Sequence, residues 1–298
     1  MDSYNKSTLV CIHVLPLEIE MFERWINMYK KSLIYLDKKD NVTLNAVLNL
    51  NPYLTDWENS SVSKEYFATK FLNLIDSIPN ICSINYGSEL MGTTQHKRES
   101  IKLNYDQFIF CDADIIFPEQ LLKYQLEASY MLKDNYILIP NIIRLWDETW
   151  DPLVHKDFLS KDFNYYKTHD PNITLNQSVE NISLKLLLGP LKFGCGMHTL
   201  YSKSFWDLIG IPESFGGYGP EDTFAMFAGN IYNNSIPETP ILEYVLEGIY
   251  ITEDYLNRIP SFNNDIITIS LKQEQRKQAE LNFNKELEKF IKDVRTIL

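Results

Sequence analysis

Two aspartates stand between apolar segments at a spacing that suits a cation site. The run 107–111 (QFIFC) leads into Asp112 and Asp114, and the apolar run 115–118 (IIFP) follows directly. Because an unpaired buried carboxylate is costly, this placement predicts that the two side chains hold a charged partner. Residues two apart in an extended chain point the same way, so both aspartates can face one ion. Oxygen ligands of this kind suit Mg²⁺ or Mn²⁺, which in turn hold diphosphates.

A second acidic pair closes a glycine-rich segment later in the chain. Residues 215–222 read FGGYGPED and end in Glu221 and Asp222. Glycines let the backbone approach a ligand closely, and an aromatic ring can pack against the apolar side of a sugar. A carboxylate at such a place can take a proton from a hydroxyl group. The residues expected to border this ligand are Gly217, Tyr218, Gly219 and, from a different segment, Trp146.

Both acidic motifs also have a plainer interpretation. Aspartate is common at strand ends and before helices, where its side chain caps the backbone. Pro220 followed by two acids is typical of the first turn of a helix, whose dipole favours negative charge. Capping alone does not explain why three glycines and an aromatic residue precede the second pair.

The first half of the chain alternates between strand-like and helix-like patterns. Short runs rich in β-branched residues predict strands, and apolar residues at helical spacing predict helices. The expected strands are 8–15, 42–50, 81–86 and 107–111, and the expected helices are 17–36, 63–78 and 92–103. This alternation predicts an α/β sheet that is at least partly parallel, with ligands beyond the carboxyl ends of its strands.

The second half is less regular. Strands are expected at 136–143 and 192–201, helices at 203–209 and 223–228, and a long functional loop at 146–187. A charged amphipathic helix is expected over 271–298, with apolar positions 283, 287, 290, 294 and 297 in heptad rhythm. We expect this stripe to pack on the domain, and a homodimer contact is the alternative.

Composition excludes some roles. A net charge of −12 argues against nucleic-acid binding and against a polybasic membrane patch. No apolar run is long enough to span a bilayer, so membrane contact is expected to be peripheral at most. The start of the chain does not resemble a signal peptide, and the four cysteines include no CxxC pair, so a reducing, cytoplasmic location is expected.

Asp112-Ala113-Asp114 at a strand end, followed by GGYGPED, resembles the nucleotide-sugar glycosyltransferases of the GT-A fold. The similarity is greatest to the inverting group that includes chondroitin-polymerase-like and β-1,4-galactosyltransferase-like enzymes. It extends over residues 8–255, although two short motifs carry it. The resemblance implies a GT-A, Rossmann-like α/β fold with a mixed, mostly parallel sheet flanked by helices. The expected domain is 1–260, with a donor half at 8–118, an acceptor half at 136–255 and a helical extension at 261–298.

The resemblance also implies a role for each site residue. Asp114 would be the main ligand of Mn²⁺ or Mg²⁺, and Asp112 would contact the metal or the ribose. Asp222 would be the catalytic base and Glu221 an acceptor ligand. The donor would be a nucleotide-diphosphate sugar, expected to be a UDP-sugar, and the acceptor a hydroxyl of a glycan or glycolipid in polysaccharide biosynthesis. Further donor contacts would come from His13, Pro16, Lys97 and Arg98.

Two departures from the family pattern leave alternatives open. No histidine follows His198, so either Glu247, Glu253 or Asp254 takes its place as a further metal ligand, or the metal binds weakly. His198 itself is expected to be a core histidine. Asn49-Leu50-Asn51 stands where acidic residues often contact the base and ribose. The rival interpretations are a nucleotidyltransferase and a catalytically inactive sugar-binding protein of the same fold.

Overall fold

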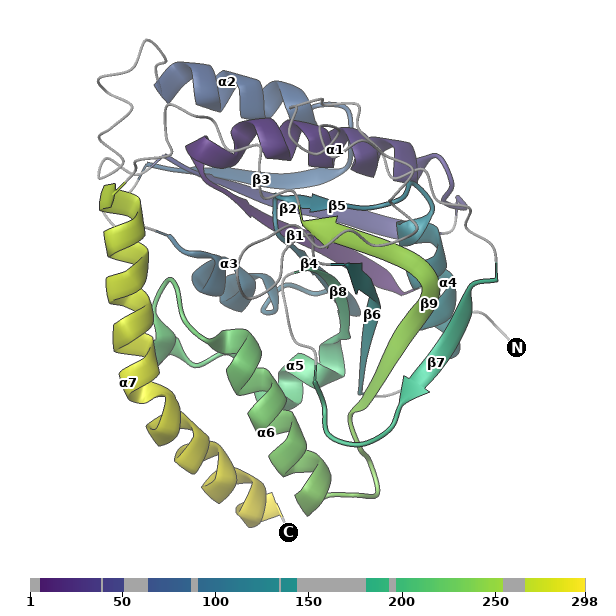
Figure 1. Cartoon of the computed structure of the whole chain (residues 1–298), viewed down its shortest axis with the longest axis vertical. Helices are drawn as coiled ribbons and strands as arrows, with labels where there is room; N and C mark the ends of the chain where they lie inside the picture. Colours follow the sequence, from purple (N-terminus) through teal and green to yellow (C-terminus); the bar gives the residue numbers. More distant parts are fainter. Residues whose placement is uncertain are drawn as a thin grey trace.

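A computed structural model describes residues 6–38, 40–50, 64–86, 91–133, 135–143, 181–192, 197–253 and 266–297. Trp146, Asp254 and most of the expected long loop lie outside these ranges. Figure 1 shows a single sheet with helices on both of its faces. The expected mixed α/β architecture with a C-terminal helix is therefore confirmed.

The described part of the sheet has nine strands in the order β3-β2-β1-β4-β8-β6-β9-β5, with β7 paired to β9. β1 pairs in parallel with β2 and β4, β2 with β3, and β6 with β9, whereas β8, β5 and β7 run in the opposite direction. The strands are β1 Ser7–Val14, β2 Asn41–Asn49, β3 Asn80–Asn85, β4 Gln107–Cys111, β5 Ile115–Ile116, β6 Tyr136–Ile143, β7 Ser183–Leu187, β8 Met197–Ser202 and β9 Leu242–Glu253.

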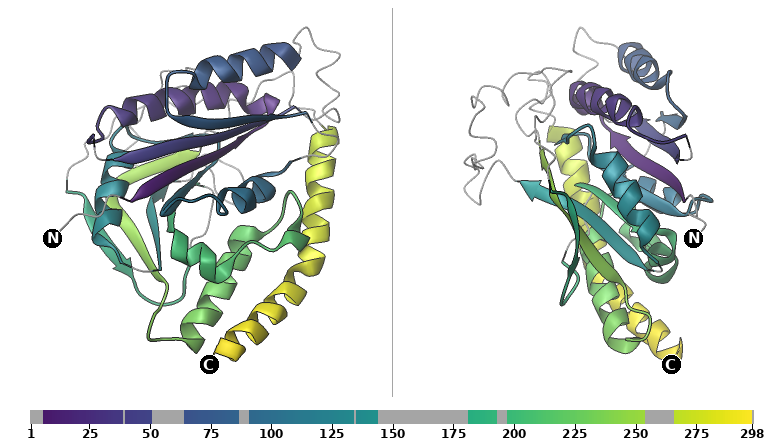
Figure 2. Two further views of the ribbon diagram at one scale, coloured as in Figure 1. Left: turned by 180° about the vertical axis from the view of Figure 1, so that it is seen from behind. Right: turned by 90° about the vertical axis from the view of Figure 1, so that its right-hand side faces the viewer.

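The helices form two layers that enclose the sheet (Figure 2). Their bounds are α1 Ile19–Leu33, α2 Lys64–Ile75, α3 Thr93–Ser100, α4 Leu121–Met131, α5 Lys203–Ile209, α6 Glu221–Ser235 and α7 Ile266–Ile297. One hydrophobic cluster joins α1, α2 and α4 to the sheet, and a second joins α5, α6 and α7 to it. Each face of the sheet therefore has its own core.

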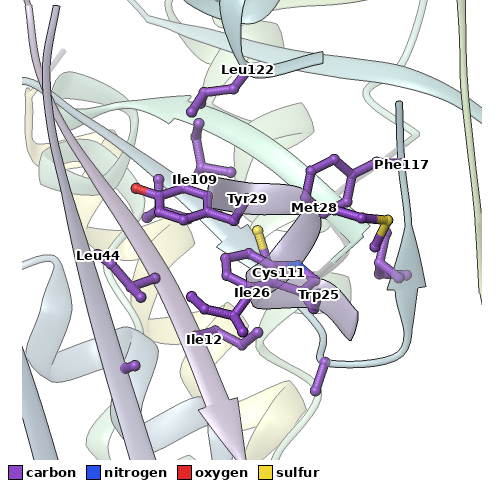
Figure 3. Close-up of a cluster of buried hydrophobic side chains, with 14 of the residues drawn as sticks. Ile12, Trp25, Ile26, Met28, Tyr29, Leu44, Ile109, Cys111, Phe117 and Leu122 are labelled. Carbon is purple, nitrogen blue, oxygen red and sulfur yellow. The ribbon is translucent and has the colours of Figure 1, made fainter. Parts of the chain in front are cut away.

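The core beneath α1 follows from the spacing of its apolar residues. Trp25, Ile26 and Tyr29 of α1 are fully buried and reach toward β1 and β4 (Figure 3). Trp25 stacks on Tyr29 with ring centroids 5.1 Å apart, and its edge meets Phe117 at 5.9 Å. Because Phe117 is separated from Asp114 only by the two residues of β5, this packing anchors the segment that carries Asp112 and Asp114.

The structure corrects three expectations. The twelve-residue strand β9 was not predicted, because Gly248, at φ 88°, and a register shift against β6 interrupt its pattern. β7 forms within the range that was predicted to be a loop, where β9 offers it a partner. Residues 112–114 turn between β4 and β5 instead of continuing a strand, and the Ile115 N–H donates to the Asp112 carbonyl at 3.4 Å. The extended geometry assumed for the two aspartates is therefore wrong.

The apolar stripe of α7 packs on the domain, as expected. Phe283, Leu287, Phe290 and Val294 belong to the cluster that joins α5 and α6 to the sheet. A homodimer through α7 would have to use another face of the helix, and it stays a prediction. Within the described ranges, no helix has the length and apolar character needed to cross a membrane.

Candidate active site

The carboxyl ends of β3, β2, β1 and β4 meet at one edge of the sheet because these strands are parallel. Polar side chains cross this edge. Asn85 donates to the Asn49 side chain at 2.8 Å, and Asn49 donates to the Met91 carbonyl at 3.0 Å. His13 Nε2 lies 2.6 Å from the same carbonyl and donates to it. This is where ligands bind in open α/β sheets, and Pro16 begins the short turn that follows β1.

Helix α3 brings a second segment to this edge. We call residues 215–220 the glycine loop. The Gln95 N–H donates to the Gly217 carbonyl at 3.4 Å, and Arg98 Nη1 donates to the carbonyls of Pro212 and Gly216 at 3.2 and 3.1 Å. Arg98 is buried, and its observed bonds hold the glycine loop. Its predicted contact with a donor stays a prediction.

Gly92, just before α3, should not tolerate a side chain. A Cβ atom there would lie 1.7 Å from the Gly217 carbonyl oxygen, far inside van der Waals contact with backbone. We expect Gly92→Ala to cost at least about 1–3 kcal/mol of stability, as overpacking does, and to displace the glycine loop. Thermal unfolding measures the cost.

Gly229→Ala is the matched control. Its new Cβ would lie 2.6 Å from the Cδ1 atom of Leu191 and 3.5 Å from the Cδ1 atom of Ile241, both of them ends of flexible side chains. Alanine is also more favourable than glycine in the interior of a helix. The net change in the free energy of unfolding should therefore be within about 1 kcal/mol. If Gly92→Ala unfolds no earlier than this control, the close approach of α3 and the glycine loop is not rigid.

Lys97 of α3 lies at the centre of a charged cluster. Its Nζ atom is 2.6 Å from Glu221 Oε1 and 3.0 Å from Asp222 Oδ1. The same atom lies 5.7 Å from the centre of the Phe110 ring in β4. The exposed fractions of the three side chains are 6% for Lys97, 3% for Glu221 and 33% for Asp222. Of these three, Asp222 is the one that a substrate can reach.

Both carboxylate oxygens of Glu221 are occupied. Lys97 bonds to Oε1, and Thr94 Oγ1 donates to Oε2 at 2.6 Å. The Thr94 hydroxyl also accepts the Gly219 N–H at 2.7 Å, so it ties the glycine loop to the acid. Because Glu221 is buried and already bonded twice, these contacts assign it to holding Lys97 and Thr94. Its predicted role as an acceptor ligand stays a prediction.

Burial and neighbouring charges shift the pKa values of Lys97 and Asp222. Burial alone would lower the pKa of Lys97, but the charges of Asp222, Glu221 and Asp112 outweigh it and hold that pKa well above its ordinary value. Burial raises the pKa of Asp222 to about 7, opposed by Lys97 and supported by Glu221 and Asp112. A carboxylate with a pKa near neutrality is suited to accept a proton at physiological pH.

One residue of the first acidic motif acts on this cluster. The charge of Asp112, in the turn after β4, raises the pKa values of both Lys97 in α3 and Asp222 in α6. Sequence reasoning missed Thr94, whose role depends on the glycine loop reaching α3. His198 is fully buried beside Phe117, with ring centroids 4.8 Å apart, so it is a core residue as expected.

The residues of this edge fit a divalent cation by charge and ligand chemistry. Asp112 and Asp114 are half-buried in the turn after β4, beside a cluster that already contains two carboxylates and the ammonium group of Lys97. Across the described ranges, no set of three or more histidine, cysteine, aspartate or glutamate side chains is arranged to hold a metal. Mg²⁺ often takes only one or two carboxylates and completes its shell with water and phosphate.

The candidates for a third ligand lie in different places. Glu247 pairs with Lys185 at 2.9 Å on the exposed ribbon formed by β7 and β9. The backbone of Glu253 lies opposite Ile115 in the pairing of β5 and β9, and Ile115 directly follows Asp114 in the sequence. A third ligand from Glu253 stays a prediction.

No protein-family model matches the sequence, and no curated protein matches it. Among solved structures, GalNAc-T7 with UDP, GalNAc and Mn²⁺ is similar at TM-score 0.49 and 10% identity, over 99% of this chain and 55% of that chain. The mannosyltransferase PcManGT from Pyrobaculum calidifontis, with GDP-Man and Mn²⁺, gives 0.48 and 10%, over 98% and 74%. The inositol-1-phosphate CTP transferase from T. maritima gives 0.41 and 13%, over 91% and 96%.

This chain spans about half the length of GalNAc-T7 and 60% of the length of the S. aureus TarS fragment. Likenesses of this size carry no argument about substrate or mechanism. The functional case rests on the cluster around Lys97.

Proposed function

We propose that this protein is a GT-A-type glycosyltransferase that moves a sugar from a nucleotide-diphosphate donor to a hydroxyl group, with inversion. The observation that carries the proposal is the contact of Lys97 with Glu221 and Asp222 at the ligand-binding edge, where Asp222 is partly exposed. Burial raises the pKa of Asp222 to about 7, and the charge of Asp112 also raises it. An inverting transfer needs one accessible base opposite the leaving group, and the cluster offers such a group.

The chemistry divides between the two acidic motifs. The ionised Asp222 carboxylate takes the proton of the acceptor hydroxyl, and the hydroxyl oxygen then attacks the anomeric carbon. The bond between that carbon and the diphosphate oxygen breaks, and its electron pair leaves with the nucleoside diphosphate. Asp112 and Asp114 would hold a divalent cation, which when bound neutralises the charge that develops on the departing diphosphate.

The donor is proposed to lie along the edge formed by His13, Pro16 and Asn49. A UDP-sugar fits the proposal best, and a glycan or glycolipid would supply the hydroxyl. The acceptor side is proposed to be lined by Gly217, Tyr218 and Gly219, which precede the proposed catalytic base Asp222 in the sequence. The donor half would then be residues 8–118 and the acceptor half residues 136–255.

Binding of UDP tests the metal assignment. Calorimetry should show UDP binding that is strengthened by Mn²⁺ in the unmodified protein. Even outer-shell changes cost 10–100-fold in metal affinity, so Asp114→Asn should weaken Mn²⁺-supported binding by at least about tenfold. Binding of UDP without metal should change little, which serves as the internal control.

A hydrolysis screen over UDP-sugars then tests the reaction class. Slow, metal-dependent hydrolysis of one UDP-sugar supports the proposal. Release of pyrophosphate from a nucleoside triphosphate and a sugar phosphate would identify a nucleotidyltransferase instead. UDP binding without turnover of any donor, with or without acceptors, would identify an inactive sugar-binding protein.

A further inference from the structure

Helix α7 passes directly behind the glycine loop. A Cβ atom built on Gly219 would lie 3.0 Å from the Cβ atom of Ala279 and 2.9 Å from that of Phe215. These distances leave no room for a larger group on either side. Ala279 is buried, so the small side chain at this point of α7 permits the helix and the loop to meet.

Three further contacts join α7 to the segment that leads into the loop. Phe283 stacks on Phe215, with ring centroids 6.3 Å apart and nearly parallel planes. The Asn282 side chain donates to the Ser214 carbonyl at 3.2 Å, and the Ser214 hydroxyl donates to Glu286 at 2.6 Å. Backbone, hydroxyl and aromatic ring of the segment 214–215 are thus all held by one helix.

The opposite side of the loop is held by α3. The Gly219 N–H donates to Thr94 Oγ1, which donates to Glu221, and Glu221 bonds to Lys97. The loop is therefore clamped between two helices that lie far apart in the sequence. Asp222 follows three residues after Gly219, at the start of α6. A displacement of the loop would move this carboxylate relative to Lys97.

We propose that Ala279 of α7 is a positioning residue for the base Asp222, acting through its contact with Gly219. This inference rests on the proposed function for its catalytic consequence, because Asp222 is the base only if the protein transfers sugars. The clamp itself is a physical claim about the loop and can be tested without any activity.

The test compares two buried positions of α7. Ala279→Met places a larger side chain against Gly219, whereas Val294→Ala removes packing near the far end of the helix, away from the glycine loop. Amide hydrogen exchange over residues 213–222 is the main measurement, with strand β4 as the internal reference. We expect exchange in 213–222 to quicken about tenfold or more in Ala279→Met, and to stay within about twofold of the unmodified protein in Val294→Ala.

A conservative variant separates positioning from general destabilisation. Ala279→Gly keeps the close approach but weakens the helix, so its melting temperature should fall while exchange in 213–222 stays near the unmodified level. Equal loop exchange in Ala279→Met and Val294→Ala, at matched melting temperatures, would overturn the clamp. Faster loop exchange with an unchanged kcat, in a protein that transfers sugar, would overturn its link to Asp222.

The two proposals fail in different ways. Where the unmodified protein shows turnover, Ala279→Met should lower kcat about 10–100-fold with little change in the KM for the donor, because misplacing a reacting group costs rate and not donor affinity. Absence of turnover in the unmodified protein would remove the proposed function, while the exchange result would still decide whether α7 holds the loop.

Discussion

Replacing Asp222 with Asn should lower the rate of sugar transfer by about 10²–10⁴-fold, the usual contribution of a general base. The amide keeps the shape of the side chain but cannot take the proton of the acceptor hydroxyl. Donor binding should be nearly unchanged, because the donor is proposed to bind at the ends of β1, β2 and β4. Steady-state kinetics gives kcat, and calorimetry with UDP and Mn²⁺ gives donor affinity.

The control for this variant is Asp207→Asn. Asp207 is an exposed acid on α5 that pairs with Lys203 one helical turn away, remote from the sheet edge. Its loss should leave kcat within about twofold and stability within about 1 kcal/mol, as for most surface ion pairs. Wild-type turnover in Asp222→Asn would remove this residue from the mechanism.

The same assignment predicts how the rate depends on pH. The base works only when ionised, and burial raises the pKa of Asp222 to about 7. The rate should therefore increase as pH rises through this pKa. A bound cation beside Asp112 would lower the pKa of Asp222. In the presence of metal, the midpoint of the rate increase should therefore lie at or below neutral pH.

Lys97→Met should be the most damaging single change to stability. It would leave Glu221 buried with no cation, and breaking a buried pair on one side typically costs about 3–5 kcal/mol. It would also remove the charge that opposes the rise of the Asp222 pKa, so any remaining activity should shift its midpoint to higher pH. Denaturant unfolding measures the first effect, and kcat/KM against pH measures the second.

A double variant and a surface control test whether the loss of stability comes from the unpaired charge of Glu221. Lys97→Met with Glu221→Gln removes both charges and should recover a large part of the lost stability, since Glu221 then leaves no buried charge unpaired. Asp222 also loses its partner, but its side chain is 33% exposed. Lys102→Met, an exposed lysine paired with Glu99 just after α3, should cost no more than about 1 kcal/mol. Similar losses from Lys97→Met and Lys102→Met would show that the Lys97 cluster contributes little to the fold.

The Asp222→Asn and Lys97→Met variants distinguish the roles of the two acids, Glu221 and Asp222. Glu221 and Asp222 are neighbours in sequence at the start of α6, yet one is buried and doubly bonded while the other is partly exposed. The exposed acid is proposed to do the chemistry, and the buried acid to hold the lysine that adjusts it. Such a division explains why a lysine predicted to bind the donor is found paired with the acids of α6.

Much of the first half of this protein is determined by its own sequence. Strands β1, β2 and β4 and helices α1 and α2 appear where β-branched runs and helical spacing predict them, because these segments bury their own apolar residues in the two cores. Helix α3 also forms where it is predicted, although its buried residues are polar or charged. The sequence also marks Asp112, Asp114 and the glycine loop as candidate site residues, since carboxylates between apolar runs and clustered glycines are costly to the fold.

Tertiary structure alone decided how these pieces act together. β9 and β7 depend on partners from other parts of the sheet, and a turn replaces the extended geometry expected at Asp112. The pairing of Lys97 with Glu221 and Asp222 joins residues more than a hundred positions apart, and so does the bond from Thr94. Local patterns report burial and backbone preference, whereas the pKa of Asp222 and the clamp on its loop arise from contacts that exist only once α3, α6 and α7 have packed.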